Sequence, residues 1–518
     1  MQKKEVYEDI SPKTLLAFFA MIVGMFMAIL DIQIVASSLS VIAAGLSASG
    51  DELSWIQTSY LIAEVIIIPI TGFAARLLST RIVYFVAALG FTIMSVLCAL
   101  AWNIESMIIF RALQGLFGGV MIPIAFGAVF IIFPKSMHTK VSMLIGLVVT
   151  VAPTVGPTLG GYITETISWH FMFLLNVIPG IFVCVTVFLF VDFDKPNYKL
   201  LNNFDILGIL LMAISLGGLQ YVLEEGNKKD WFQDNHILSL SILVVVTFVW
   251  LLIRELSCKN PIIDLNAFRN KNFSFGCVYS FILGVGLYGT VYLLPLFLFS
   301  IAGYNTLQIG ITMIVTGVFQ FVSAPLAGKM MESGTDKRII LAIGFGTFSL
   351  GCYLNSFLTA ESQYWELFLP QMVRGLALMF CFMPINDLAL GTMSKNDVQN
   401  ASGLYNLTRN LGGAIGLAII NSLITSKSQI YAQSLKDNMP LTSPQVQEYI
   451  RFFTQSLIGK VNNPEITAYQ LLDNIVMREA FVIAINNVFV IIAALFCLGM
   501  FLIPFSSTPK IQASIDAH

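Results

Sequence analysis

Several ionisable residues lie within long apolar stretches of the chain, which is an unusual place for a charge. Among them are Asp31, Glu64 and Arg111, and two further arginines, Arg374 and Arg409, lie in later stretches. A charged side chain at the centre of a bilayer costs about 2.5–3.5 kcal/mol on insertion scales, so each such residue needs a specific role. Carboxylates in this setting can bind and release protons, which is what coupling to a proton gradient requires. We therefore predict that Asp31, Glu64 and Arg111 are the proton-coupling residues.

A structural role is the alternative for each of them. A buried carboxylate can be paired permanently with an arginine of a neighbouring helix. Arg111 begins only a few residues inside its apolar run, so its long side chain can also extend to the membrane surface. The sequence leaves both interpretations open.

Polar residues also recur at helical spacing inside apolar runs. The spacing of Gln57, Tyr60 and Glu64 places them on one helix face, and Gln308, Thr312 and Gln320 follow the same rule. Such a face lines either a polar cavity or a packed interface, and we favour the cavity. The predicted substrate-cavity residues are Gln57, Tyr60, Gln114, Gln308, Thr312, Gln320, Asn406 and Arg409.

One apolar run is rich in glycine and proline. Small residues every three or four positions permit close contact between helices, and proline removes a backbone donor. We expect this segment to be a tightly packed, kinked gating helix, with a passive packing helix as the alternative. The predicted gating residues are Pro153, Gly156, Pro157, Gly160 and Gly161.

The composition shows what kind of protein must position these residues. Of 518 residues, 57% are hydrophobic and only 11% are charged, whereas soluble domains are about 25% charged. A net charge of −2 argues against a nucleic-acid binder. The cysteines are scattered singly and the histidines lie far apart, so neither a disulfide framework nor a metal site is predicted. The class of protein that agrees with this composition is an all-α polytopic membrane protein.

Fourteen apolar runs are long enough, or nearly so, to cross a bilayer. They cover residues 15–38, 53–75, 82–101, 107–133, 141–163, 171–191, 206–223, 237–253, 273–301, 309–326, 339–358, 367–390, 401–424 and 480–505. Most lysines and arginines of the short loops fall on the side of the N-terminus. By the positive-inside rule we expect both termini to be cytoplasmic.

A weak internal repeat suggests how the spans are grouped. Pro69 and Gly72 precede Arg81 at the spacing with which Pro325 and Gly328 precede Lys337. Related halves are common in transporters, so we expect two six-helix bundles that flank two inserted spans. The predicted division is a cytoplasmic N-terminus 1–13, an N-terminal bundle 14–192, a linker with the inserted spans 193–271, a C-terminal bundle 272–505 with a periplasmic loop 426–479, and a cytoplasmic C-terminus 506–518.

The loop 426–479 is the largest extramembrane segment. Its apolar and polar residues alternate at helix-like spacing, which predicts an amphipathic helical hairpin that lies on the membrane or contacts a partner. A simple connecting loop is the alternative.

Several motifs together resemble the major facilitator superfamily, in particular its 14-span drug:proton antiporters of the EmrB/QacA type. The resemblance rests on Leu30-Asp31-x2-Ile34-Val35, Arg111-x2-Gln114-Gly115-x2-Gly118-Gly119, Gly156-Pro157-x2-Gly160-Gly161, Trp169-His170-x2-Phe173-x2-Asn176-x2-Pro179-Gly180 and Asn406-x2-Arg409-x2-Gly412-Gly413-x2-Gly416. It covers nearly the whole chain. Arg76 and Ser79 depart from the superfamily pattern, which has an acid and a glycine at these positions of the loop after the second span.

This resemblance implies proton-driven export of hydrophobic or amphipathic drugs and toxic compounds across a bacterial inner membrane. It further implies a tripartite pump with a periplasmic adaptor protein and an outer-membrane channel. No nucleotide-binding motif of the Gly-x4-Gly-Lys-Ser/Thr type is present, so the proton gradient is the expected energy source, without a cofactor or an enzymatic activity. A dedicated exporter of one endogenous metabolite or siderophore remains an alternative, and a non-transporting membrane sensor or a membrane enzyme is a remote one.

Overall fold

The apolar runs form helices, as a membrane requires, because a lipid-exposed backbone must satisfy its own hydrogen bonds. The computed structural model describes residues 11–36, 38–48, 52, 54–203, 205–258, 261–394, 397–440 and 442–506. These residues form helices without any strand, and fourteen of the helical segments are long and apolar enough to cross a membrane. The predicted all-α fold with fourteen spans is confirmed. Most of the predicted terminal segments 1–13 and 506–518 lies outside the described residues.

The first six spans form the N-terminal bundle. They comprise α1 (Pro12–Ala36), α4 (Trp55–Ile67) with η1 (Ile68–Ile70) and α5 (Thr71–Leu78), α6 (Thr80–Ala99), α7 (Ile104–Ile132), α8 (Lys135–Thr166), and α9 (His170–Leu174) with α10 (Val177–Phe190), while the short α2 (Leu39–Gly45) follows α1. Pro69 interrupts the second span, where it removes a backbone donor. The sixth span is interrupted at Asn176, which precedes α10.

The next two spans, α11 (Ile206–Glu225) and α12 (Asn235–Ser257), form a hairpin, and η3 (Trp231–Gln233) lies in its loop. Asp205 caps α11 through the Gly208 amide at 2.9 Å and pairs with Arg254 at 2.8 Å. Burial raises the pKa of Asp205, but the hydrogen bonds from Arg254 and Gly208 and the charge of Arg254 outweigh it and hold this pKa below its usual range. The ion pair thereby joins the two helices at their base.

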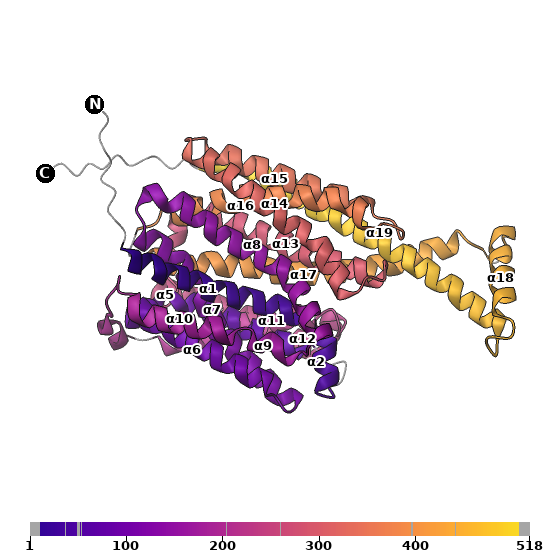
Figure 1. Ribbon diagram of the computed structural model, residues 1–518, viewed down its shortest axis with the longest axis horizontal. Helices are drawn as coiled ribbons and strands as arrows, with labels where there is room; N and C mark the ends of the chain where they lie inside the picture. Colours follow the sequence, from indigo (N-terminus) through magenta and orange to yellow (C-terminus); the bar gives the residue numbers. More distant parts are fainter. Residues whose placement is uncertain are drawn as a thin grey trace.

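The last six spans form the C-terminal bundle. They are α13 (Lys271–Ser300), α14 (Thr306–Glu332), α15 (Lys337–Leu354) with η5 (Asn355–Phe357), α16 (Tyr364–Leu390), α17 (Val398–Asp437) and α19 (Pro464–Leu502) with η6 (Ile503–Phe505). The first helix begins and the last helix ends at the same end of the molecule (Figure 1). We call this the proximal end and the opposite one the distal end.

The two bundles pack against each other along α8 and α14 on one side and along α7 and α17 on the other. At the proximal end, the Gln399 amide donates to the Thr80 hydroxyl at 2.8 Å, and the Ser402 hydroxyl donates to the Pro123 carbonyl at 2.8 Å. These hydrogen bonds hold the proximal end of the interface closed.

The inserted hairpin joins the interface at the distal end. Helix α11 packs along α4 and also reaches α17. In the loop of the hairpin, the Trp231 indole donates to the Ser422 hydroxyl of α17 at 2.9 Å. Ser54, just before α4, donates to Glu225 at the end of α11 at 3.2 Å. The hairpin is therefore bound to both bundles rather than set apart from them.

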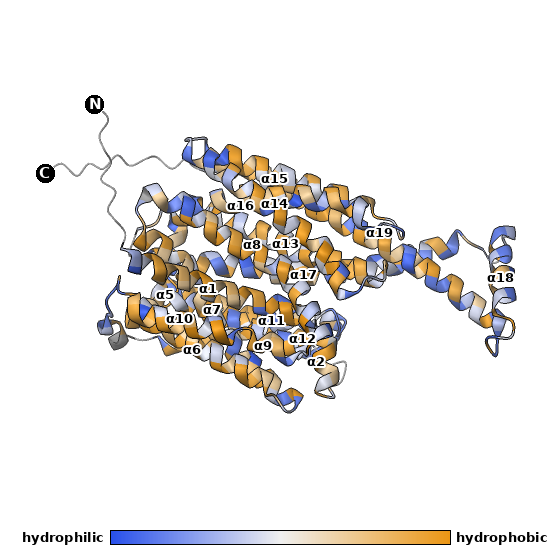
Figure 2. Cartoon of the chain, in the orientation of Figure 1, coloured by the Kyte–Doolittle hydropathy of each residue, from blue (hydrophilic) through white to orange (hydrophobic). Residues whose placement is uncertain are grey.

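Beyond the distal end, α17 and α19 continue side by side as an arm, and α18 (Pro444–Leu457) lies across its tip (Figure 1). Val446, Ile450 and Ala468 form a small apolar cluster that fixes α18 to α19. Polar residues gather on this arm, whereas apolar residues dominate the bundles (Figure 2). The segment 426–479 is helical, as predicted, and it extends away from the bundles because its first and last parts continue the spanning helices α17 and α19 (Figure 1).

Candidate functional site

The first polar centre lies inside the N-terminal bundle around Asp31 of α1, which is 2% exposed. Its Oδ2 atom accepts from Arg111 Nη1 at 2.5 Å, and its Oδ1 atom accepts from the Asn176 amide at 2.8 Å and from Gln114 Nε2 at 3.2 Å. The carboxylate is thus paired and hydrogen-bonded on both oxygens, which is how a buried charge is tolerated. The geometry brings together two of the three residues named as proton-coupling residues, in the carboxylate–arginine pairing that the sequence analysis gave as the structural alternative.

Arg111 is held from several directions and does not extend to the membrane surface. Its Nε atom donates to the Ile56 carbonyl of α4 at 3.1 Å, and its Nη1 atom also donates to Gln114 at 2.7 Å. The guanidinium lies over the Tyr60 ring, 4.3 Å from the ring centroid. Its Nη2 atom is buried without an acceptor among the described residues. Protonation of Asp31 would leave this cation without its counter-charge, so proton binding and the position of Arg111 are linked.

Asn176 belongs to this centre, and the sequence analysis did not assign it a role. It occupies the break between α9 and α10, and its amide also approaches the Ser95 hydroxyl at 3.4 Å. Ser95 in turn accepts from Gln114 at 2.8 Å. A polar residue at a helix break inside an apolar span is the signal that could have identified it, because a break frees backbone and side chain to face the interior.

The second polar centre lies between the two bundles around Glu64 of α4. The Asn410 amide of α17 donates to Glu64 Oε1 at 3.3 Å, and Tyr288 of α13 donates to Asn410 Oδ1 at 3.4 Å. Glu64 is buried. This hydrogen bond crosses from one bundle to the other, so any rocking of the bundles that separates α4 from α17 must break it.

Arg409 is the cation of the second centre. Its Nη2 atom donates to Asn406 at 2.5 Å, and its guanidinium lies 5.1 Å from the centroid of the Phe126 ring in the opposite bundle. Its charge acts on Glu64 without a direct ion pair. The Arg409 Nε and Nη1 atoms are buried and have no acceptor in the described part of the chain. A carboxylate, a guanidinium and aromatic rings therefore meet at the interface.

The other predicted cavity residues have different positions. Gln308 is exposed at the distal start of α14, where it forms a capping box with Asn305, so it is not a cavity residue. Thr312 is buried and donates to the Gln308 carbonyl of its own helix at 3.0 Å. Gln114 belongs to the Asp31 centre rather than to the interface. Gln57 is half-buried in the first turn of α4. Gln320 is fully buried, and neither atom of its amide has a partner among the described residues.

The predicted gating helix is α8, which contains both Pro153 and Pro157 and runs without interruption. A Cβ atom added to Gly156 would collide with the side chain of Gln33 on α1, and one added to Gly161 would collide with Thr306 of α14. These glycines therefore allow α8 to pack against its own bundle on one side and the opposite bundle on the other. Gln33 lies two residues from Asp31 on α1, so this close contact is at the same level of the helix as the first polar centre but on another face.

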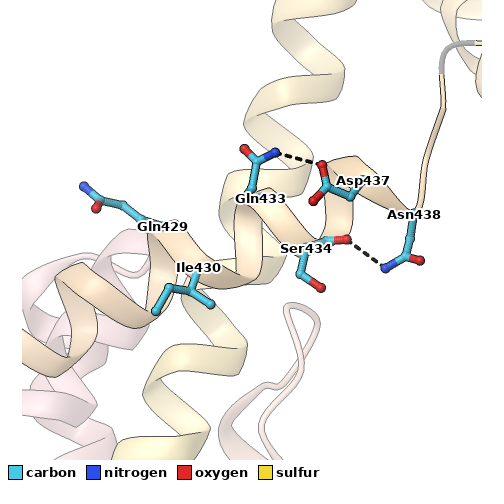
Figure 3. A pocket seen from close by; sticks show the side chains of 6 residues that line it. All are labelled: Gln429, Ile430, Gln433, Ser434, Asp437 and Asn438. Carbon is cyan, nitrogen blue, oxygen red and sulfur yellow. Dashed lines mark hydrogen bonds between the residues drawn. The ribbon is translucent and has the colours of Figure 1, made fainter.

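A surface groove lies elsewhere, on the arm. It is open and shallow, and Figure 3 shows its lining along the distal end of α17. In it, the Gln433 amide donates to Asp437 at 2.8 Å and the Asn438 amide donates to the Ser434 carbonyl at 2.8 Å. The groove shares no residue with either polar centre, so it does not belong to the same site.

Comparisons with known proteins agree with this architecture. The model of the Major Facilitator Superfamily matches residues 21–417. The chain is 41% identical over 422 residues to the colistin resistance protein EmrB of Acinetobacter baumannii, which covers 82% of each chain. It is 28% identical over 496 residues to the multidrug export protein EmrB of Haemophilus influenzae, which covers 96% of each chain.

A solved structure of the same fold is that of the human organic anion transporter MFSD10. The alignment covers 95% of this chain and 100% of that one, with a TM-score of 0.59 and 11% sequence identity. At this identity the likeness concerns the fold alone. From the family match, the relatives and the fourteen apolar spans together, the chain is a member of the major facilitator superfamily of membrane transporters and a relative of the EmrB multidrug exporters.

Proposed function

We propose that this protein is a proton-coupled antiporter that exports hydrophobic or amphipathic compounds from the cytoplasm across a bacterial inner membrane. The observation that carries the proposal is the Asp31–Arg111 pair, a buried carboxylate whose protonation would free a cation inside the bundle. The multidrug export function named for a relative supports the substrate class. On the positive-inside rule the proximal end faces the cytoplasm and both termini lie there.

The two polar centres suggest how protons and substrate are exchanged. Asp31 lies within one bundle, and Glu64 lies at the interface that must open and close. A proton on Glu64 removes the charge that draws Asn410 and Arg409 toward α4, which weakens the contact between the bundles. Substrate would occupy the space near the aromatic rings around Arg409 once the bundles separate.

Transport by the purified full-length chain in proteoliposomes tests this proposal. Ethidium is a suitable probe, because it is a permanent cation whose own charge does not respond to pH. An acidic lumen should drive ethidium into the vesicles, and a protonophore should abolish the uptake. Uptake that is unaffected by the pH gradient, in vesicles shown to be tight to protons, would contradict proton coupling.

We further propose that the arm binds a periplasmic adaptor protein, which would in turn connect to an outer-membrane channel. Large apolar side chains are exposed on α18 and on the arm part of α19, including Tyr449, Phe452 and Ile466. Exposed apolar residues with a polar rim are typical of protein interfaces. The arm points away from the bundles at the distal end, which faces the periplasm in the proposed orientation (Figure 1).

Co-purification tests the adaptor proposal. Full-length chain with Tyr449 and Phe452 changed to serine should recover less of a co-expressed periplasmic adaptor protein than the wild type does. A chain with the exposed polar residue Gln455 changed to serine is the matched control and should recover the wild-type amount. Equal recovery by all three chains would place the interface elsewhere.

A further inference from the structure

Arg374 of α16 is a buried cation without an anion. Its side chain is 2% exposed in the middle of the C-terminal bundle. Its Nε and Nη1 atoms have no hydrogen-bond acceptor among the described residues. None of the ion pairs found in the described ranges includes it. Arginine does not lose its proton in proteins, so the charge remains.

Comparison with the N-terminal bundle shows which group Arg374 lacks, namely a carboxylate partner like that of Arg111. Gly115 of α7 packs on the backbone of Tyr60, and Gly375 of α16 packs on the backbone of Thr316 in the same way. Gly375 therefore corresponds to Gly115. Arg374, which directly precedes Gly375, then corresponds to Gln114, which directly precedes Gly115. The cation of the C-terminal bundle is therefore displaced by one helical turn relative to Arg111, and no described carboxylate accompanies it as Asp31 accompanies Arg111.

The polar groups named on the elements next to α16 are neutral amides with unpartnered N–H donors, and none of them supplies a counter-charge for Arg374. Gly351 of α15 leaves room for its aliphatic stem, since a Cβ there would lie 2.8 Å from Arg374 Cγ. One turn farther along the chain, the Asn355 side-chain Oδ1 atom accepts from the Gln371 amide at 3.3 Å, while its Nδ2 atom is buried without an acceptor among the described residues. On α14, which packs along α16, both the Nε2 and the Oε1 atom of Gln320 are buried without a described partner. Unpaired N–H groups thus lie on three neighbouring elements of the bundle.

Desolvating a guanidinium with no counter-charge is strongly unfavourable, and so is burying amide donors without acceptors. One anion placed among these donors would satisfy both requirements. The close packing at Gly351 and the small exposure of Arg374 restrict such an anion to a small size. We propose that Arg374, together with Asn355 and Gln320, forms a binding site for a small inorganic anion of the size of chloride. This proposal does not depend on the transport activity.

Thermal unfolding of the detergent-solubilised full-length protein tests the site. A thiol-reactive fluorescent dye reports unfolding, because Cys98, Cys277 and Cys381 are buried in the folded chain. At equal ionic strength and pH, the midpoint should be about 2 °C or more higher in chloride than in gluconate, as expected for a ligand that binds the folded state.

Substitutions assign the effect to this site. Arg374→Gln should remove the difference between the two salts, and Arg374→Lys, which keeps a cation, should retain part of it. Lys329→Gln removes an exposed cation of α14 and should respond to chloride like the wild type. Should Arg374→Gln not fold, Asn355→Leu provides the second test, since it should raise the chloride concentration needed for half of the stabilisation. A wild-type midpoint equal in both salts, or a chloride response retained in full by Arg374→Gln or Asn355→Leu, would overturn the proposal.

Discussion

At the scale of single residues, the two acids predicted to carry protons occupy different environments. Asp31 is saturated with hydrogen bonds inside one bundle, and Glu64 has a single partner in the other bundle. A saturated carboxylate holds its neighbours in place, whereas a singly bonded one can release its partner when it is protonated. The first fits proton-linked rearrangement within a bundle, and the second fits the opening of the interface.

Asn176→Ala tests whether the Asn176 amide, at the helix break, affects proton binding by Asp31. Losing a donor to a charged acceptor costs about 1.5–3 kcal/mol, and it penalises the ionised form. The pH at which ethidium transport is half-maximal should therefore move upward by about one unit or more. Asn176→Asp is unsuitable because it adds a charge. Ser95→Ala is the comparison variant: it removes the 3.4 Å contact of the same amide and the 2.8 Å hydrogen bond from Gln114 but leaves both amide donors to Asp31 in place, so it should shift the profile less. An unchanged profile in Asn176→Ala would exclude a positioning role.

Asn410→Leu tests the hydrogen bond between the bundles. It removes the donor to Glu64 but keeps a similar volume, so the closed interface should lose about 0.5–1.5 kcal/mol. Spin labels placed on exposed distal positions of the two bundles should show a larger share of long distances in double electron–electron resonance. Thr408→Val, two residues away, removes a hydroxyl that donates to the Tyr405 carbonyl of its own helix at 2.8 Å, so it should leave the distances as in the wild type.

At the scale of elements, close packing by glycine is the main requirement. Gly156→Ala would press a methyl group into Gln33 of α1 and should cost about 1–3 kcal/mol of overpacking. Transport should fall because the contact lies at the level of Asp31 on α1, while the protein still inserts. Gly346→Ala is matched in chemistry, but its Cβ would lie 3.7 Å from Met500, an ordinary contact, so it should transport normally. Equal transport by both variants would show that α8 is not a close-packed gate.

The sequence predicts the inserted hairpin only as two spans flanked by the bundles, and the structure shows that it contacts both of them. Asp230 and Trp231 both have positive φ angles near 53–54°, which non-glycine residues rarely adopt. That backbone aims the Trp231 indole at Ser422 of α17. Trp231→Phe should loosen the hairpin from α17, and Ser422→Ala removes the same hydrogen bond from the other side. The two variants should broaden the distance distribution between labels at Asn227 and α17 to a similar extent, and an unchanged width would contradict a bridging role.

At the scale of the whole molecule, the sequence predicted the fold well, because fourteen spans follow directly from hydrophobic length. It named Asp31 and Arg111 separately, and it gave pairing with an arginine of a neighbouring helix only as the structural alternative, whereas the structure joins these two residues in one ion pair. It could not place Gln308, because polar spacing on one face does not distinguish a helix cap from a cavity wall. It did not identify Asn176 or Asn410, whose partners come from helices far away in the chain.

At this scale, substrate binding at the interface and proton release from the Asp31 centre are coupled in the proposed mechanism. Proton release on substrate binding measures this coupling most directly, with purified protein in weakly buffered detergent solution, a pH indicator and ethidium as the ligand. The wild type should release protons as ethidium binds, and Asp31→Asn should bind ethidium but release fewer protons than the wild type does. Ethidium binding to the wild type with no proton release at any pH across the transport range would contradict the account.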